Sequence, residues 1–164
     1  MKHTLVALVE NEPGVLNRVV SLFRRRNFNI DSLTVGRTES AEVSRITIVV
    51  DSDVQNTAQV EKNLYKLVNV IRVEDVTDIP LIARDLALIK VKASEDVSRI
   101  CYEHGARIID VSADLVMIEM SDAEDRVEAL IEELRPIGIV EMVRTGVVSM
   151  GRGSHVIHAE PELA

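Results

Sequence analysis

The feature that most constrains this chain is the order in which strand-like and helix-like hydrophobic patterns follow one another. Short apolar runs, typical of strands, lie at residues 3–9, 31–38, 44–51 and 69–76. Between them, apolar residues recur at helical spacing, from Val15 to Phe23 and from Val60 to Val68. The first half of the chain therefore has the order strand, helix, strand, strand, helix, strand, which is that of a ferredoxin-like domain.

The same order returns in the second half. The proline-containing stretch "TDIPLIARD" interrupts the periodicity at residues 77–85, and the pattern then restarts. Strand-like runs follow at residues 86–92, 107–113, 114–120 and 138–150, with helical stripes from Val97 to His104 and from Val127 to Leu134. We therefore predict an α+β protein with two ferredoxin-like βαββαβ domains. Its expected parts are a first domain at residues 1–77, a linker at 78–85, a second domain at 86–153 and a tail at 154–164.

Charge and composition argue against several kinds of partner. The formal net charge of −8 argues against nucleic acid and anionic membranes, because binding to such surfaces requires an excess of cations. An RNA-recognition domain has the same strand order but stacks bases on aromatic residues, and only 2% of this chain is aromatic. The single cysteine fits a reducing compartment, and no apolar stretch approaches the roughly 20 residues of a membrane span. We therefore expect a cytoplasmic protein.

The first predicted helix begins at an unusual residue. Gly14 lies in its first turn, although glycine costs about 1 kcal/mol relative to alanine in a helix. With Asn11 as the N-cap, the amides of Gly14, Val15 and Leu16 are among the donors that a helix leaves unpaired at its start. Because Gly14 has no side chain, an anion can approach these amides. The alternative is that Gly14 only provides the backbone angles of a tight turn.

The residues around this turn indicate which anion would suit it. Glu10 and Glu12 flank the turn and would repel a phosphate dianion, whereas they tolerate an ammonium group beside a carboxylate. The lysine and the further glycines of a phosphate-binding loop are absent. A free amino acid meets these conditions. Asn29, between the first helix and the second strand, is a further candidate, although asparagine is also a common turn residue there.

The sequence does not point to a catalytic or metal site. Cys101 and His104 lie three residues apart on a predicted helix, but both fall on its apolar stripe, which favours packing over nucleophilic catalysis. His155 and His158 could bind a metal ion only with ligands from elsewhere in the chain. We therefore predict a protein that is not an enzyme, with no catalytic residue and no metal site.

Several segments resemble a known family. "LVENEPGVLNRVVSLFRRRNFNIDSLTVGRTE", "SRITIVV" and "KNLYKLVNVIRVEDVT" resemble the N-terminal ACT domain of the small regulatory subunit of acetohydroxyacid (acetolactate) synthase. "LALIKVKA", "ARIIDVSADLVMIEM" and "RPIGIVEMVRTGVVSMGRG" look like the second domain of the same family. The resemblance runs from about residue 3 to about residue 153, which is nearly the whole chain.

The resemblance implies a regulator in branched-chain amino acid biosynthesis. Proteins of this family form homodimers or larger assemblies and bind a branched-chain amino acid, chiefly valine, where two ACT domains meet. They thereby inhibit a large catalytic subunit, which they activate when the effector is absent. Thiamine diphosphate, Mg²⁺ and FAD are expected in that catalytic subunit, and no cofactor is expected in this chain. On the family pattern, the effector is held by Asn11, Gly14, Val15 and Leu16 of one copy and by Asn29 and Ile30 of the other. The alternative is a free-standing ACT-type amino-acid sensor that acts on another target.

Overall fold

The computed structural model describes residues 1–51 and 54–158. The chain divides into two compact units. Of the described residues, unit 1 contains 1–51, 54–82 and 149–158, and unit 2 contains Ala83–Val148. Each unit has its own sheet, its own pair of helices and its own hydrophobic core.

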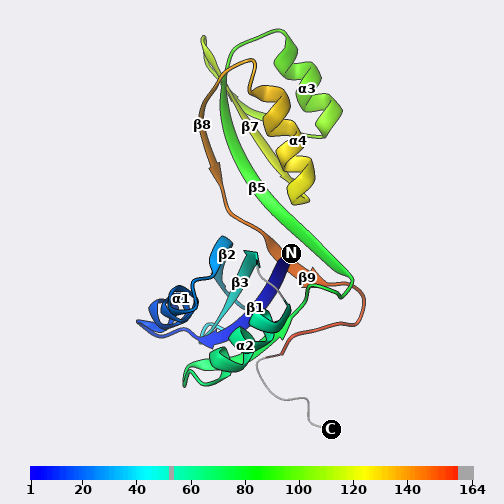
Figure 1. Ribbon diagram of the computed structural model, residues 1–164. Coiled ribbons are helices and arrows are strands. Elements are labelled where there is room, and N and C mark those ends of the chain that lie inside the picture. Colours follow the sequence, from blue (N-terminus) through cyan, green and yellow to red (C-terminus); the bar gives the residue numbers. More distant parts are fainter. Residues whose placement is uncertain (52–53, 159–164) are drawn as a thin grey trace. The chain divides into compact units, whose positions relative to one another are not determined.

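Unit 1 is built on a four-stranded antiparallel sheet with two helices on one face (Figure 1). Its elements are β1 (Lys2–Glu10), α1 (Val15–Arg25), β2 (Asn29–Arg37), β3 (Val43–Asp51), α2 (Val54–Tyr65) and β4 (Val70–Asp75). The strands lie in the order β2-β3-β1-β4, so β2 and β4 are the two edge strands. The core forms where the helices pack against alternate residues of β1 and β3. The helices contribute Val15, Val19 and Phe23 from α1 and Leu64 from α2.

The opposite face of this sheet is also buried. Val6 and Leu8 of β1 and Val49 of β3 alternate with the core residues, and each is at most 5% exposed. The chain that returns to unit 1 after Val148 contacts this face, since the Arg45 guanidinium donates a hydrogen bond of 2.6 Å to the Ser149 carbonyl. Burial on both faces explains why β1 is an almost continuous apolar run rather than an alternating one.

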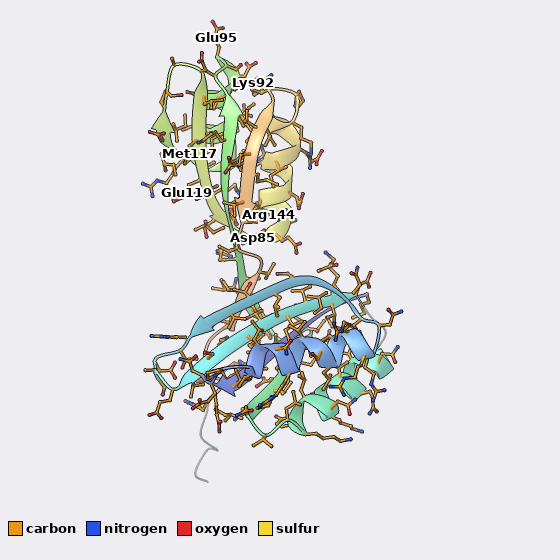
Figure 2. All side chains as sticks on the ribbon, turned by 90° about the vertical axis from the view of Figure 1, so that its left-hand side faces the viewer. Asp85, Lys92, Glu95, Met117, Glu119 and Arg144 are labelled. Carbon is orange, nitrogen blue, oxygen red and sulfur yellow. The ribbon has the colours of Figure 1, made fainter. Side chains whose placement is uncertain are left out.

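The second sheet has the strand order β6-β7-β5-β8, with β9 paired to β5 outside this path. The elements are β5 (Leu81–Lys92), α3 (Asp96–His104), β6 (Arg107–Val111), β7 (Leu115–Asp122), α4 (Glu124–Leu134), β8 (Ile139–Arg144) and β9 (Val148–Gly151). In unit 2, α3 and α4 cover one face of the sheet (Figure 1) and bury Ile100 and Leu130 against Ile89 and Ile118. Met117 and Glu119 of β7, labelled in Figure 2, alternate with these buried residues and are partly exposed.

The predicted order of elements is confirmed in both halves, but the limits of the elements differ from the expected ones. β5 begins at Leu81, inside the expected linker 78–85. Pro80 directly precedes it, a position that a proline can occupy because it lies outside the strand's hydrogen-bonding ladder. The predicted last strand at residues 138–150 is divided into β8 and β9, and between them Gly146 has φ +86°. A residue in this left-handed conformation interrupts a strand.

The returning chain also differs from the expected division. We expected residues 149–153 in the second domain and a tail from residue 154, whereas the described residues 149–158 belong to unit 1. The Arg152 amide donates a hydrogen bond of 2.9 Å to the Pro80 carbonyl, and His155 contacts the Glu74 carboxylate on β4. These contacts join residues more than 70 positions apart, so local periodicity does not reveal them.

Candidate effector-binding site

The connection from β1 to α1 is shaped by Gly14. This residue takes the N-cap position of α1 with φ +84°, in the left-handed region that L residues other than glycine rarely adopt. A Cβ built on Gly14 would meet no heavy atom within 4 Å. The turn therefore requires glycine for its backbone angles, and the space in front of Gly14 is open.

The first turn of α1 has backbone donors without acceptors. The Val15 amide makes a long hydrogen bond of 3.4 Å to the Glu12 carbonyl, and the regular helical bonds begin where the Arg18 amide donates to the Gly14 carbonyl. Among the described residues, no acceptor is found for the amides of Gly14, Leu16 and Asn17. Unpaired amides at a helix start, where the helix dipole is positive, favour an anion such as a carboxylate.

The expectation that Asn11 caps the helix is wrong. Gly14 occupies that position, because Pro13 and Gly14 form the turn and move the helix start beyond reach of the Asn11 side chain. Instead, the Asn11 amide donates a hydrogen bond of 2.8 Å to the Glu42 carbonyl, and its Nδ2 donates one of 3.2 Å to the Ala41 carbonyl. Asn11 therefore fixes the turn between β2 and β3 beside the start of α1.

Within one chain, Asn29 and Ile30 lie far from Gly14. They begin β2, where Asn29 is opposite Asp51 of β3, whereas Glu10 at the end of β1 is opposite Val43 of β3. Val43 and Asp51 are eight residues apart on β3. At about 3.3 Å per residue, the end of β1 at Glu10 and the start of β2 at Asn29 are about 26 Å apart along β3. The structure thus brings Asn11, Gly14, Val15 and Leu16 together at one end of the sheet and places Asn29 and Ile30 at the other.

Two residues that the sequence did not suggest hold an acidic neighbour of the turn. The Asn69 side chain donates a hydrogen bond of 2.9 Å to the Glu10 carboxylate and accepts one from the Arg18 guanidinium. The Glu12 side chain has no hydrogen-bond partner among the described residues. Glu12 is therefore the carboxylate beside Gly14 that is available to an ammonium group. No local pattern marks Asn69, because it comes from the turn before β4.

The other candidates from the sequence do not form reactive sites. The Cys101 side chain is only 3% exposed, and burial raises the pKa of its thiol, so the reactive thiolate is disfavoured. His104 contacts the Glu133 carboxylate on α4 instead of pairing with Cys101. His155 and His158 do not lie on a helix, and among residues 1–51 and 54–158 no group of three metal-ligating side chains is found.

A buried ion pair in unit 2 is structural. Asp85 on β5 and Arg144 on β8 lie side by side at the same end of the sheet (Figure 2), with a bond of 2.8 Å from Arg144 Nε to the carboxylate. Asp85 is 2% exposed, and Arg144 also contacts Glu128 on α4. The pair therefore joins two neighbouring strands and a helix within one unit.

Unit 1 has the fold of an ACT domain, a regulatory module, with a glycine at the start of its first helix. Residues 5–72 match the family described as AHAS small subunit-like ACT domain. Residues 84–153 match the family described as small subunit of acetolactate synthase.

Individual relatives are similar to this chain over nearly its whole length. The probable acetolactate synthase small subunit of Archaeoglobus fulgidus is 48% identical over 158 residues, which cover 94% of this chain and 99% of that protein. The small subunit of Bacillus subtilis is 41% identical, covering 94% and 92%. The crystal structure of the Thermotoga maritima small subunit has a TM-score of 0.88 at 38% identity, covering 94% of this chain and 99% of that one. The chain belongs to the acetolactate synthase small-subunit family, which confirms the predicted family and the prediction of a non-catalytic subunit. Among the described residues, no helix is both long and apolar enough to cross a membrane.

Proposed function

We propose that this protein is the regulatory subunit of a cytoplasmic acetohydroxyacid synthase and binds a branched-chain amino acid, chiefly valine, between two copies of its ACT domain. Bound effector inhibits the catalytic large subunit, and the effector-free protein activates it. The observation that carries this proposal is the set of unpaired amides at Gly14, Leu16 and Asn17 behind an open approach. These donors fit a carboxylate, and Glu12 beside them fits an ammonium group.

The arrangement of the sheet supports a site shared by two chains. β2 is an edge strand of nine residues, and an edge of this length is commonly covered by another chain. A twofold axis through an antiparallel β2–β2 pair would place Asn29 of one copy near Arg37 of the other. Arg37 lies at the same end of the sheet as Gly14, since it pairs with Ser44 beside Val43. Homodimerisation through β2 would therefore unite the two groups of site residues that one chain keeps apart.

The proposed contacts suit an aliphatic amino acid of modest affinity. Leu16 is 42% exposed and Ile30 is half-buried, so both offer apolar surface to a branched side chain. Valine has eight heavy atoms, and a limit of about 1.5 kcal/mol per atom caps its binding free energy near 12 kcal/mol. Sensing a metabolite at sub-millimolar concentration requires only about 5–6 kcal/mol, well within this limit.

We assign the catalytic cofactors, thiamine diphosphate, Mg²⁺ and FAD, to the large subunit and none to this chain. The decisive experiment reconstitutes the large subunit with this protein and titrates valine, leucine and isoleucine against its activity. We expect activation by the effector-free protein and inhibition on addition of valine. If this protein neither binds nor changes the large subunit, the free-standing amino-acid sensor becomes the better explanation.

A further inference from the structure

Unit 1 contains a pocket on the sheet face that α1 and α2 do not cover. The pocket has a volume of about 290 Å³, close to the lower end of small-molecule sites at about 300 Å³. Its apolar wall consists of Leu8 and Val43 from the sheet and of Met150 and Ile157 from the returning chain. All four residues belong to unit 1. Leu8 and Arg45 are paired in register and point to this face, so the pocket is distinct from the start of α1.

Two arginines, Arg37 and Arg45, line the same pocket, and neither forms an ion pair among the described residues. Among the described residues, no carboxylate oxygen lies within 4.0 Å of the Arg37 or Arg45 guanidinium. Arg45 is half-buried, and its hydrogen bond to the Ser149 carbonyl leaves most of its donors unused. Burial lowers the pKa of Arg45, because the charged form loses water, while Glu39 and Glu74 act on it from a distance. A partly desolvated cation of this kind is stabilised by an anion that forms direct hydrogen bonds with it.

We propose that this pocket is a second small-molecule site, which binds a short branched aliphatic carboxylate. The carboxylate pairs with Arg45 and Arg37, and the branched carbon chain contacts the wall formed by Leu8, Val43, Met150 and Ile157. Glu39 also lines the pocket and disfavours a phosphate dianion, whereas a single carboxylate leaves the local charge balanced. Both a branched-chain amino acid and the corresponding 2-oxo acid have this chemistry.

The test is calorimetric titration of the full chain carrying Gly14→Asp, which blocks the proposed effector site at α1. The two probes are L-valine and 2-oxoisovalerate, which differ only in the amino or oxo group. We expect at least one probe to bind, and Arg45→Gln in the same background to weaken that binding by about tenfold or more, since it removes a charge-assisted contact. Arg45→Lys, which keeps the charge, should retain part of the affinity.

Arg72→Gln is the matched control. Arg72 lies on β4 in register with Leu8, on the same row of the sheet as Arg45, but it does not line the pocket. In the Gly14→Asp background, the Arg72→Gln control should bind the probe with the same affinity as the chain that carries Gly14→Asp alone. Melting curves of each variant establish that it is folded, and Arg37→Gln provides a second test at an exposed residue of the pocket.

The outcomes separate this site from the effector site. If only valine binds, Glu39 accepts the ammonium group. If only the oxo acid binds, Glu39 does not accept it. Either result supports the proposal that the pocket binds a carboxylate. The proposal is overturned if neither probe binds more tightly than about 10 mM, or if Arg45→Gln and Arg37→Gln both bind like the control. By contrast, the proposed function fails if Gly14→Asp leaves valine inhibition of the reconstituted enzyme unchanged, whatever the arginine variants show.

Discussion

Replacing Gly14 with aspartate should separate effector binding from folding. Gly14 is the N-cap of α1, and two of the amides without acceptors belong to Leu16 and Asn17, the second and third helical residues. These are the two amides that an N-cap side chain normally satisfies. A carboxylate on residue 14 would therefore lie in the position that we propose for the carboxylate of valine.

The effect on stability can be worked out from the backbone. A left-handed conformation costs a non-glycine residue about 1–2 kcal/mol, although aspartate adopts it more readily than most. An N-cap carboxylate returns about 1 kcal/mol, and its interaction with the helix dipole adds about 0.3–1 kcal/mol. No heavy atom lies within 4 Å of a Cβ at this position, so no steric term is added. Gly14→Asp should therefore change the free energy of unfolding by less than about 1 kcal/mol, whereas the uncapped Gly14→Ala should lose about 1–2 kcal/mol.

Denaturant unfolding and calorimetry with valine test the two parts of this prediction. We expect Gly14→Asp to lose valine binding and the inhibition of the reconstituted enzyme, and Gly14→Ala to weaken binding less, because a methyl group is smaller than a carboxylate and offers no acceptor to the amides of Leu16 and Asn17. A folded Gly14→Asp chain that binds valine with unchanged affinity would show that the effector carboxylate is held elsewhere. A large loss of stability would show instead that the strain at φ +84° dominates.

Three further variants test other parts of the structure. Asn29→Ala should weaken valine binding by about 1–3 kcal/mol in calorimetry, the range for an unsatisfied polar partner, with little change in melting temperature. Asp85→Ala should lower the free energy of unfolding by about 1.5–3 kcal/mol, because it removes the hydrogen bonds that Arg144 donates to the buried Asp85 carboxylate, while Arg144 keeps its contact with Glu128. Burial and two carboxylates of β4 raise the pKa of Glu61, so the protonated form is favoured in the folded state and stability is lost as the pH rises. Glu61→Gln should therefore melt at a higher temperature than the unaltered chain at neutral pH, with no difference below the ordinary carboxyl pKa of 4.5.

The sequence predicted what local periodicity controls. The order of helices and strands followed from apolar spacing, and the stripe from Val15 to Phe23 packs as expected through Val15, Val19 and Phe23. Asparagine is a good capping residue, so the sequence predicts Asn11 as the N-cap. In the structure the left-handed Gly14 is the N-cap, and the helix begins at Val15. Backbone angles of this kind depend on the whole turn, which residue preferences describe only in part.

Long-range contacts could not be read from the pattern. The return of residues 149–158 to unit 1 depends on hydrogen bonds to Arg45 and Pro80, which lie far away in the sequence. The register places Gly14 and Asn29 at opposite ends of the sheet, and their proposed joint site requires a second chain, so only the family resemblance suggested it. No sequence pattern marks Arg45, and the structure shows that it is half-buried, with no carboxylate oxygen of the described residues within 4.0 Å of its guanidinium.

The separation of the site residues within one chain has a consequence for regulation. Because Asn29 and Ile30 lie at the opposite end of the sheet from Gly14, one chain alone lacks two of the six residues proposed to contact valine. Under the proposed function, valine binds best to the arrangement of two chains that completes the site, and this difference in affinity is what allows occupancy to select that arrangement. If the large subunit prefers the other arrangement, linkage requires reciprocity: the factor by which valine weakens binding of the large subunit must equal the factor by which the large subunit weakens binding of valine. Measuring both affinities tests the coupling, and a large subunit that leaves the affinity for valine unchanged would exclude regulation through binding equilibria of this kind.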